Sequence, residues 1–350
     1  IENRHPEVSI ASLWAEVWYE RYPEPRYVWQ SSAATSSFEP KFSLVPLVFG
    51  TLKAAIYAML FAVPMALMAA VYTAYFMSPG LRGWLKPAIE MMAALPTVIL
   101  GFLAGLWFAP ILEANLAGFF LFPAFMAVGL VAFVALRGWL PARLGAHALR
   151  GMEPLVLLPV IVVLGVLAFW LDDPVQAAFF GGDLSHWLEA EAGISYNQRN
   201  SLVIGVAMGF AVIPIIFSLA EDALHDVPES LSSGSLALGA TRWQTLARVV
   251  LPVASPGIFA ALMIGMGRAV GETMIILMAT GNTPIMDWNV FEGMRTLAAN
   301  IAIEMPESEL GSSYYRILFL SALVLFAFTF IINTAAELIR QRLRSRYKAL

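Results

Sequence analysis

Long apolar stretches separated by short polar segments repeat along this chain. A membrane-spanning helix needs about 20 mainly apolar residues. Seven stretches come close to or meet this requirement: 54–77, 91–112, 116–136, 155–171, 201–220, 256–280 and 317–336. The pattern lacks the short alternating segments of a membrane barrel. It therefore predicts an all-α, polytopic membrane helical bundle, in which the short fourth stretch is either a span or a re-entrant segment.

Composition agrees with a membrane protein and narrows its chemistry. The chain is 59% hydrophobic and 13% charged, whereas a soluble domain is about a quarter charged. It has no cysteine, which excludes disulfides, thiolate catalysis and cysteine-ligated metal. No nucleophile–base set or metal cluster is visible, and no Gly-Lys dipeptide of a phosphate-binding loop occurs. We expect no enzyme activity, no metal and no cofactor in this chain.

Positive charge is distributed unevenly between the loops. Segments 78–90, 137–154, 221–255 and 337–350 hold most of the 21 Lys and Arg residues. The alternate loops hold only Arg199, Arg295 and Arg316. Because Lys and Arg concentrate in cytoplasmic loops, this bias predicts a cytoplasmic C-terminus and an N-terminal segment outside.

The first 42 residues form the predicted outer segment and linker. The chain starts at Ile1 rather than Met, so we expect it to be the end of a truncated N-terminal region. Apolar residues then repeat at helical spacing: Ile10, Leu13, Trp14, Val17 and Trp18. This pattern is compatible with an interfacial helix or with a helix docked on a larger outer domain.

Small residues mark the helix faces that are expected to pack closely. Pairs spaced as Gly-x-x-x-Gly occur in the second, fifth and sixth stretches: Gly101 and Gly105, Gly205 and Gly209, Gly267 and Gly271. Such pairs let two membrane helices approach each other. The third and fourth stretches lack them, so we predict that residues 113–200 contain an inserted peripheral hairpin and an outer loop. Lys53 and Glu90 lie near span ends, where their side chains are expected to snorkel.

The polar segment 221–255 carries helix signals outside the expected spans. Pro228 and Glu229 favour a helix start, Gly239 interrupts the pattern, and Thr241 can cap a second helix. An apolar stripe follows, formed by Trp243, Leu246, Ala247 and Val250. Pro252 and Pro256 are expected to end it. These signals predict two short helices at the inner membrane face, suited to docking in the groove of a soluble partner.

Two opposite charges lie inside the sixth stretch. Arg268 is near its centre, where an arginine costs about 2.5–3.5 kcal/mol on insertion scales. Glu272 is four residues on, so in a continuous helix it could form an ion pair with Arg268. One interpretation is a buried pair that only fixes packing. The other is an anion site on a transport path, since a guanidinium binds phosphate through two hydrogen bonds.

The segment 221–255 resembles the cytoplasmic coupling loop of ABC importer permeases. That loop reads EAA-x-x-x-G, nine residues, then I-x-L-P. Gly239 matches the glycine, while Val249, Leu251 and Pro252 match the final motif. The acidic residue is missing, because Ser233 stands in its place; Glu229, one turn upstream, is a possible substitute. The resemblance implies that a partner ATPase contacts Ser233, Ser235, Gly239, Ala240, Thr241, Leu251 and Pro252.

The run GRAVGETM at 267–274 is similar to a motif of the phosphate-importer permeases within that family, and the resemblance extends over most of 43–340. It implies a type I (MetI-like) permease core over 43–342, followed by a basic cytoplasmic tail at 343–350. It also implies that Arg268 and Glu272 lie on the substrate pathway.

The resemblance further implies a bacterial inner-membrane complex. Its other parts would be a second permease (PstA-like), an ATPase dimer (PstB-like) that binds ATP and magnesium, and a periplasmic phosphate-binding protein (PstS-like). Two alternatives stay open. One is a permease for another oxyanion, such as sulfate or molybdate. The other is a channel or an energy-coupling membrane subunit without an ATPase.

Overall fold

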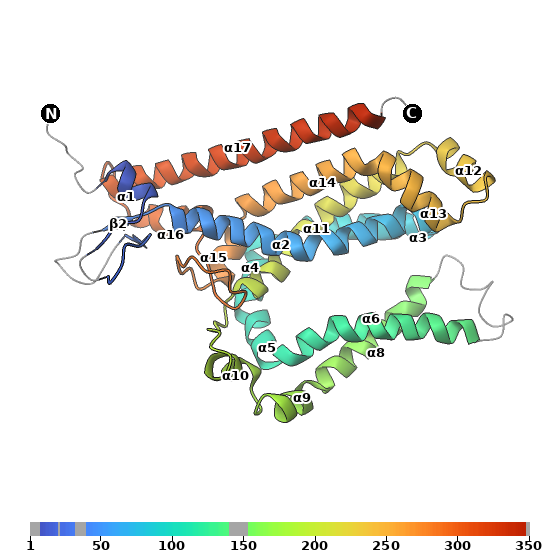
Figure 1. The fold of residues 1–350 in the computed structure, drawn as a ribbon, viewed down its shortest axis with the longest axis horizontal. Helices are drawn as coiled ribbons and strands as arrows, with labels where there is room; N and C mark the ends of the chain where they lie inside the picture. The colour runs from blue at the N-terminus through green and yellow to red at the C-terminus, as the bar shows by residue number, and fades with distance from the viewer. Residues whose placement is uncertain (1–7, 20–21, 32–39, 140–152, 348–350) are drawn as a thin grey trace.

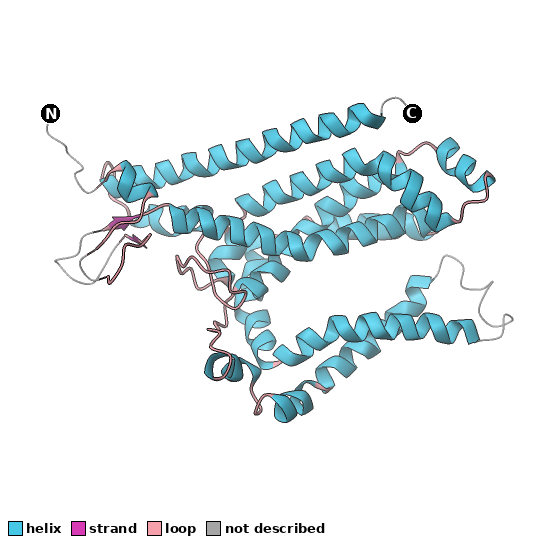
Figure 2. Cartoon of the chain, viewed as in Figure 1, coloured by secondary structure: helices cyan, strands magenta, loops and turns pink. Residues whose placement is uncertain are grey.

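The computed structural model describes residues 8–19, 22–31, 40–139 and 153–347. Within these residues, seven helical segments are long and apolar enough to cross a membrane, which confirms the predicted number of spans. They are Val45–Phe76, Thr97–Ala114, Leu116–Phe133, Leu157–Ala190, Ser201–His225, Arg242–Gly271 and Ser313–Arg342. Figure 2 shows that helices dominate the described chain and that two short strands lie at one end of it.

Four long helices run side by side in the main bundle (Figure 1): α2 (Val45–Val71), α11 (Ser201–His225), α14 (Leu251–Gly271) and α17 (Ser313–Tyr347). Helix α11 packs on α2 and α14, and α14 also packs on α17. Alanines spaced by four along α2 are almost fully buried, from Ala54 to Ala70. Gly205 and Gly209 of α11 lie against Tyr57 and Phe61 of α2. Small side chains therefore allow the close approach of these two helices.

The second span begins later than the sequence predicts. Residues 79–92 form a separate amphipathic helix, α3 (Pro79–Met92), which has no buried residue. After a turn, Pro96 precedes α4 (Thr97–Leu103), the π-helical turn η2 (Ala104–Phe108) and α5 (Ala109–Ala114). Proline disfavours the helical conformation of the residue before it, so Leu95–Pro96 separates the two helices.

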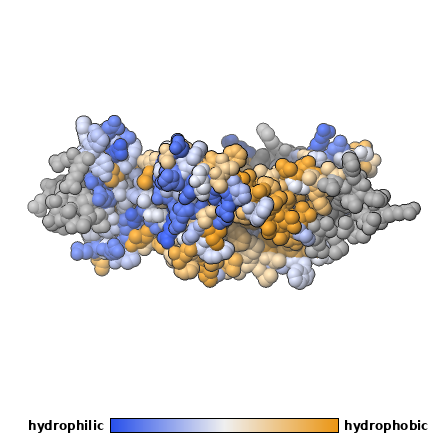
Figure 3. Space-filling view, turned by 90° about the horizontal axis from the view of Figure 1, so that it is seen from below, coloured by the Kyte–Doolittle hydropathy of each residue, from blue (hydrophilic) through white to orange (hydrophobic). Residues whose placement is uncertain are grey.

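Helices α6 (Leu116–Trp139) and α8 (Glu153–Trp170) form a hairpin whose two arms pack mainly on each other. The short helices α9 (Asp172–Phe179) and α10 (Leu184–Ala190) follow, so the segment expected to be an outer loop is partly helical. In Figure 3 hydrophobic surface covers the hairpin, and hydrophilic surface gathers towards the end that carries α9 and α10. The hairpin thus presents an apolar surface along its length, as a lipid-facing element does.

The N-terminal segment packs on the end of the bundle. Its helix α1 spans only Ile10–Trp14, shorter than predicted, because Ala15 is extended and Val17 pairs with Arg26 in a β-bridge. Strands β1 (Trp29–Gln30) and β2 (Lys41–Phe42) pair antiparallel. Leu13, Trp29 and Phe42 are buried in a cluster with residues of α2 and α17. Of the apolar repeat, only Leu13 enters this core, whereas Ile10, Trp14 and Trp18 are exposed.

Candidate translocation site and coupling surface

The sixth predicted stretch is a broken helix. Helix α14 ends at Gly271, Glu272 has an extended backbone with ψ of 129°, and α15 runs from Met274 to Ala279. The predicted continuous helix across 256–280 is therefore wrong. Arg268 lies in the last turn of α14 rather than in the middle of a helix. Irregular backbone at membrane depth is tolerated where it is covered by protein or lines a cavity.

Glu272 serves the helix that follows it. Its Oε1 accepts hydrogen bonds from the backbone N–H groups of Met274 at 3.2 Å and Ile275 at 3.4 Å. A carboxylate at a helix N-terminus is also favoured by the helix dipole. Among the described residues no ion pair or hydrogen bond of Arg268 is present. The predicted Arg268–Glu272 ion pair on one helical face is therefore not formed in this conformation.

Arg268 is half-buried in the last turn of α14. A Cβ atom added at the neighbouring Gly267 would lie 3.3 Å from Oδ1 of Asn333 in α17. A pocket of about 470 Å³ continues from Gly267 along α14 and α17, and Asn333, Glu337 and Arg340 give it a polar side. Polar side chains inside membrane helices usually face cavities or partners. Arg268 follows Gly267 in sequence but is not among the residues that line this pocket.

The six glycines of the three pairs behave differently. Added Cβ atoms at Gly101 and Gly105 would meet backbone atoms of α15 at 2.8 and 2.3 Å. By contrast, Gly271 is exposed, with no atom within 4 Å of an added Cβ. No described residue of this chain packs on Gly271, so close helix packing at this glycine stays a prediction. The surface beside Arg268 and Glu272 is thus left open by this chain.

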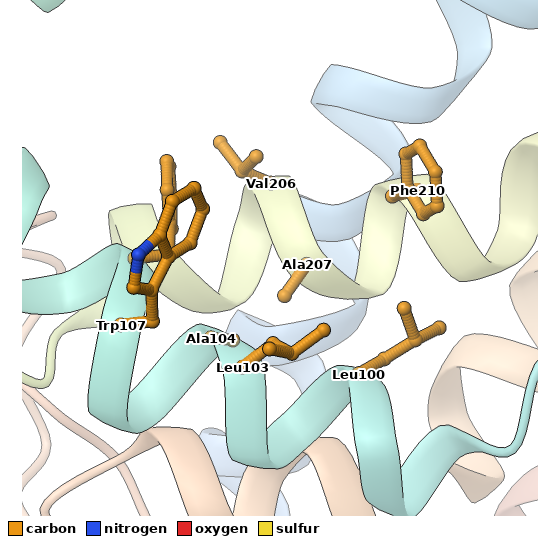
Figure 4. A pocket seen from close by; sticks show the side chains of 8 residues that line it. Leu100, Leu103, Ala104, Trp107, Val206, Ala207 and Phe210 are labelled. Carbon is orange, nitrogen blue, oxygen red and sulfur yellow. The ribbon is translucent and has the colours of Figure 1, made fainter.

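A second pocket, of about 420 Å³, lies between α4, η2 and α11 (Figure 4). Every residue that lines it is apolar: Leu100, Leu103, Ala104, Trp107, Phe108, Val206, Ala207 and Phe210. A lining without charges or hydrogen-bonding side chains other than the Trp107 indole does not suit a hydrated anion. Its chemistry therefore differs from that of the pocket between α14 and α17.

The predicted pair of short helices is present at the opposite end of the bundle from α1 (Figure 1). Helix α12 (Glu229–Ala237) starts directly after Pro228, and Gly239 has a positive φ of 87°. Thr241 caps α13 (Arg242–Thr245) in a reciprocal arrangement with Gln244. The hydroxyl groups of Ser235 and Thr245 lie 3.0 Å apart and join the two helices. The local signals in the sequence are sufficient to predict this turn.

The apolar stripe of this segment is only partly buried. Leu246 and Val250 are buried, but Trp243 is 65% exposed and Leu238 is 91% exposed. Ser233 is exposed as well. A large indole and a leucine held in water at the tip of a bundle form an unpartnered surface, which suits contact with another protein.

The prolines do not end the second short helix, so that prediction is wrong. Residues 246–250 form a π-helical turn, η3, and the chain continues directly into α14 with Pro252 and Pro256 inside it. The N–H of Leu251 bonds to the carbonyl of Leu246, five residues back. Such a wide turn is a local adjustment by which a helix can accommodate a proline, which lacks an N–H. The coupling segment is thus continuous with the helix that carries Arg268.

A buried carboxylate next to the coupling segment was not singled out from the sequence. Glu221 of α11 is 0% exposed and pairs with Arg82 at 2.5 Å and Lys86 at 2.8 Å, both in α3. Lys86 also pairs with Asp222. Burial lowers the pKa of Lys86, but its bonds to Asp222 and Glu221 have the larger, opposite effect. The pKa of Lys86 is therefore raised above its ordinary value. The four-residue spacing of Arg82 and Lys86 on an amphipathic helix was the available signal. Glu90, expected to snorkel, is exposed and accepts a hydrogen bond from Ser218.

Together, a seven-span bundle, a broken helix with an arginine and a two-helix surface at one end define a membrane transport subunit. Residues 139–347, more than half of the chain, match the family described as "Binding-protein-dependent transport system inner membrane component". The chain belongs to this family of ABC transporter permeases. It is therefore a multi-pass inner-membrane transport subunit.

Relatives cover most of the chain. A Bacillus subtilis protein named probable ABC transporter permease YqgH is 26% identical over 84% of this chain and 70% of its own length. Proteins named phosphate transport system permease PstC are similar as well. The one from Xylella fastidiosa Temecula1 is 28% identical over 87% of this chain and 76% of its own length. PstC 1 from Mycobacterium tuberculosis is 26% identical over 85% and 71%.

Among solved structures, the chain is similar to a bacterial ABC transporter described as involved in the import of the acidic polysaccharide alginate. The TM-score is 0.48 at 14% identity, covering 85% of this chain and 79% of that one.

Proposed function

We propose that this chain is a permease subunit of an ATP-driven importer of inorganic phosphate. The observation that carries the proposal is the break between α14 and α15, with Arg268 before it and Glu272 after it. Broken helices with charged ends are a recurring way of building ion and substrate sites at membrane depth. The names of the PstC relatives support phosphate as the cargo.

Arg268 would bind the anion during its passage. A guanidinium is planar, permanently charged and geometrically matched to phosphate oxygens. In this conformation no described side chain neutralises it, so it is available to a ligand. The exposed Gly271 leaves the site open to the side, where a second permease subunit would complete the path.

Glu272 would prevent the anion from binding too tightly. A carboxylate near the guanidinium reduces the net positive charge of the site, and a transport site must release its cargo. Its hydrogen bonds to Met274 and Ile275 fix it in place at the start of α15. The pocket between α14 and α17 then offers a partly polar continuation from Gly267 towards Arg340.

The partners follow from the same proposal. Arg82, Lys86, Arg242, Arg248 and the basic end of α17 mark one end of the bundle, which we assign to the cytoplasm by the excess of Lys and Arg. A separate ATPase dimer would dock on the surface around α12 and α13 and hydrolyse ATP. A second permease and an outer phosphate-binding protein would complete the importer.

Transport would proceed by alternating access. Movement of α12 and α13 would pass directly into α14, since η3 joins them without a break. The ion pairs of Glu221 would carry the same movement to α3. Both routes lead towards the Arg268–Glu272 break. The first runs along α14 itself, and the second runs from α3 to α4, the next helix in the chain, which packs on α15.

Uptake of radiolabelled phosphate tests the proposal. The complete transporter should be reconstituted in vesicles with its binding protein and ATP, with and without excess sulfate. We expect Arg268→Gln to lower uptake at least about tenfold, equivalent to the loss of roughly 1.4 kcal/mol of binding or barrier stabilisation. The exposed Arg316 provides a matched control, since Arg316→Gln should transport normally.

Three outcomes would contradict the proposal. Normal uptake by Arg268→Gln would remove Arg268 from the path. Inhibition by sulfate, with sulfate itself transported, would identify another oxyanion as the cargo. Phosphate flux that continues without ATP would indicate a channel.

A further inference from the structure

Lys53 is a fully buried charged residue in a membrane-spanning helix. It lies in α2 and is 0% exposed, so it does not snorkel to the membrane surface as its position suggested. Its Nζ donates hydrogen bonds to the backbone carbonyls of Asn289 at 2.8 Å and Glu292 at 3.3 Å. No carboxylate lies within ion-pair distance of it among the described residues. Lys53 is therefore held mainly by backbone oxygens.

These carbonyls belong to one extended segment, residues 280–296, which we name the outer strap. Three side chains at four-residue spacing on α2 hold it. Phe49 packs edge-on against Trp288 with ring centroids 4.8 Å apart. Lys53 binds Asn289 and Glu292, and the Tyr57 hydroxyl donates to the carbonyl of Trp288 at 2.6 Å. Residues at this spacing share one helix face. One face of α2 therefore holds the strap together with the start of α11, where the N–H groups of Ser201 and Leu202 bond to the carbonyls of Glu292 and Val290.

Both ends of the outer strap are fixed as well. At its start, the Thr280 hydroxyl donates to the carbonyl of Met294 at 2.9 Å, which closes the strap on itself. At its end, Arg295 pairs at 2.5 Å with Glu304, which also accepts from Trp29 and Tyr314. Between these ends, the fully buried ammonium group of Lys53 contacts the strap through the carbonyls of Asn289 and Glu292.

The outer strap is joined to the candidate translocation site. Helix α15, six residues long, separates the strap from Glu272. The backbone of α15 lies directly against Gly101 of α4 and Gly105 of η2. A displacement of the strap would therefore pull on the short helix that Glu272 caps. A rigid short element that links a loop to a site can transmit such a shift.

The chemistry of Lys53 suits an attachment that has to open. Carbonyl groups of irregular backbone need donors when buried, and an ammonium group supplies strong ones. An ion pair would add a second charge that must be rehydrated each time the contact breaks. With carbonyl acceptors, only the ammonium has to be rehydrated as a charge. When the strap lifts, water can replace the two carbonyls around the ammonium.

We propose that Lys53 is a positioning residue for transport, which holds the outer strap closed over the outer end of the path and releases it when the path opens outward. The inference rests on the importer function proposed above, but it does not depend on which anion is carried. In the closed state Lys53 fixes Asn289 and Glu292, and through α15 it sets the position of Glu272. In the open state the strap leaves α2.

Cysteine labelling from the outside tests this directly, because the chain has no cysteine of its own. Met294 is 0% exposed in the strap, and Ile285 is 43% exposed. Met294→Cys should react slowly with a membrane-impermeant maleimide in the assembled transporter, and Ile285→Cys quickly. Adding Lys53→Met should raise the labelling rate of Met294→Cys about tenfold, since two hydrogen bonds from a charged group are lost.

Matched variants separate a positioning role from general destabilisation. Lys53→Arg keeps a cationic donor and should restore slow labelling. Tyr57→Phe removes one outlying hydrogen bond and should give a smaller increase, which keeps the test available if Lys53→Met does not assemble. The thermal unfolding temperature of the complex should stay the same while labelling changes.

Equal labelling of Met294→Cys with Lys53, Lys53→Met and Tyr57→Phe would overturn the inference. So would a rise in labelling that always accompanies a lower unfolding temperature. Neither readout uses phosphate, so these results stand apart from the test of the cargo. Failure of phosphate transport with a normal labelling response would contradict only the proposed cargo.

Discussion

Arg268 and Glu272 are four residues apart in sequence, but α14 ends at Gly271 between them, so they stand on either side of a helix break. A continuous helix would have placed them on one face as an ion pair. Instead, Glu272 caps α15 through the N–H groups of Met274 and Ile275. Arg268 keeps its charge without a partner among the described residues. The break thus separates two charges that a continuous helix would bring together.

The two roles of Glu272 can be separated by substitution. Glu272→Gln keeps an amide oxygen that can accept from the α15 N–H groups but removes the negative charge. Glu272→Ala removes both, and loss of a helix cap costs about 0.5–2 kcal/mol. We expect Glu272→Gln to leave the unfolding temperature of the complex unchanged while it slows phosphate release and lowers turnover. Glu272→Ala should lower both.

Binding and uptake measured side by side check this prediction. Tighter phosphate binding with slower uptake in Glu272→Gln is the expected combination. If Glu272→Gln and Glu272→Ala were both as stable and as active as the unchanged chain, neither role of the carboxylate would hold.

Gly239 tests the coupling surface. Its φ of 87° lies in the left-handed region, where a residue with a Cβ costs roughly 1–2 kcal/mol. Gly239→Ala should therefore displace α13 relative to α12, lowering ATP-dependent uptake and transport-stimulated ATPase activity together. Gly234 is the matched control, because it lies within α12 and an added Cβ meets no atom within 4 Å. Gly234→Ala should keep full activity.

ATPase assays on the reconstituted complex distinguish the two glycines. An equal loss of activity in both variants would indicate that any change in α12 and α13 is harmful. Full activity in Gly239→Ala would show that the turn geometry does not matter for coupling.

The spans and the coupling turn were predictable because their causes are local. Apolar composition over about 20 residues defines a span, and Pro228, Gly239 and Thr241 act through their own backbone preferences. The break at Gly271 was not predictable, since Gly-Glu-Thr is also compatible with a helix. It depends on the packing of α15 against Gly101 and Gly105, whose positions are more than 160 residues away in sequence.

The surroundings of Lys53 show the same limit. Hydropathy places it near a span end, where snorkelling is the usual outcome. Its burial depends on Asn289 and Glu292, which lie 236 and 239 residues later in the chain. The helix end predicted at Pro252 and Pro256 was wrong for a different reason. A π-helical turn before them lets the helix continue although proline lacks an N–H group. Long-range contacts and helix irregularities thus decided the details that the pattern left open.

The buried carboxylate of Glu221 should matter more than its exposed neighbour. Removing one member of a buried ion pair costs about 3–5 kcal/mol. Arg82 and Lys86 are 21% and 24% exposed, so water would partly solvate them after the substitution. The loss of folding free energy should therefore fall near or below the lower end of that range. Asp222, 53% exposed, belongs to a surface pair worth about 0–1 kcal/mol. Thermal unfolding should therefore show a large decrease for Glu221→Ala and a small one for Asp222→Ala.

A double-mutant cycle identifies the cause of that decrease. The effect of Lys86→Met should become smaller in the Glu221→Ala background, because the interaction is already lost. Additive effects of the two substitutions would show that α3 is not held to α11 by this pair. Transport should fall in parallel with the coupling energy if the pair carries movement towards α3.

Gly105 and Gly271 offer a direct comparison of two glycines that the same sequence pattern marks as packing positions. A Cβ at Gly105 would lie 2.3 Å from the backbone oxygen of Met278, and this backbone cannot move aside as a flexible side chain can. Gly105→Ala should therefore push α15 away from η2 and lower the free energy of unfolding by about 1–3 kcal/mol, as overpacking does. Gly271→Ala meets no atom within 4 Å, so the folding of this chain should tolerate it. Unfolding of the detergent-solubilised permease, followed for both variants, tests the difference. Equal stability of the two would mean that α15 does not pack on Gly105, and with it the position assigned to Glu272 would fail.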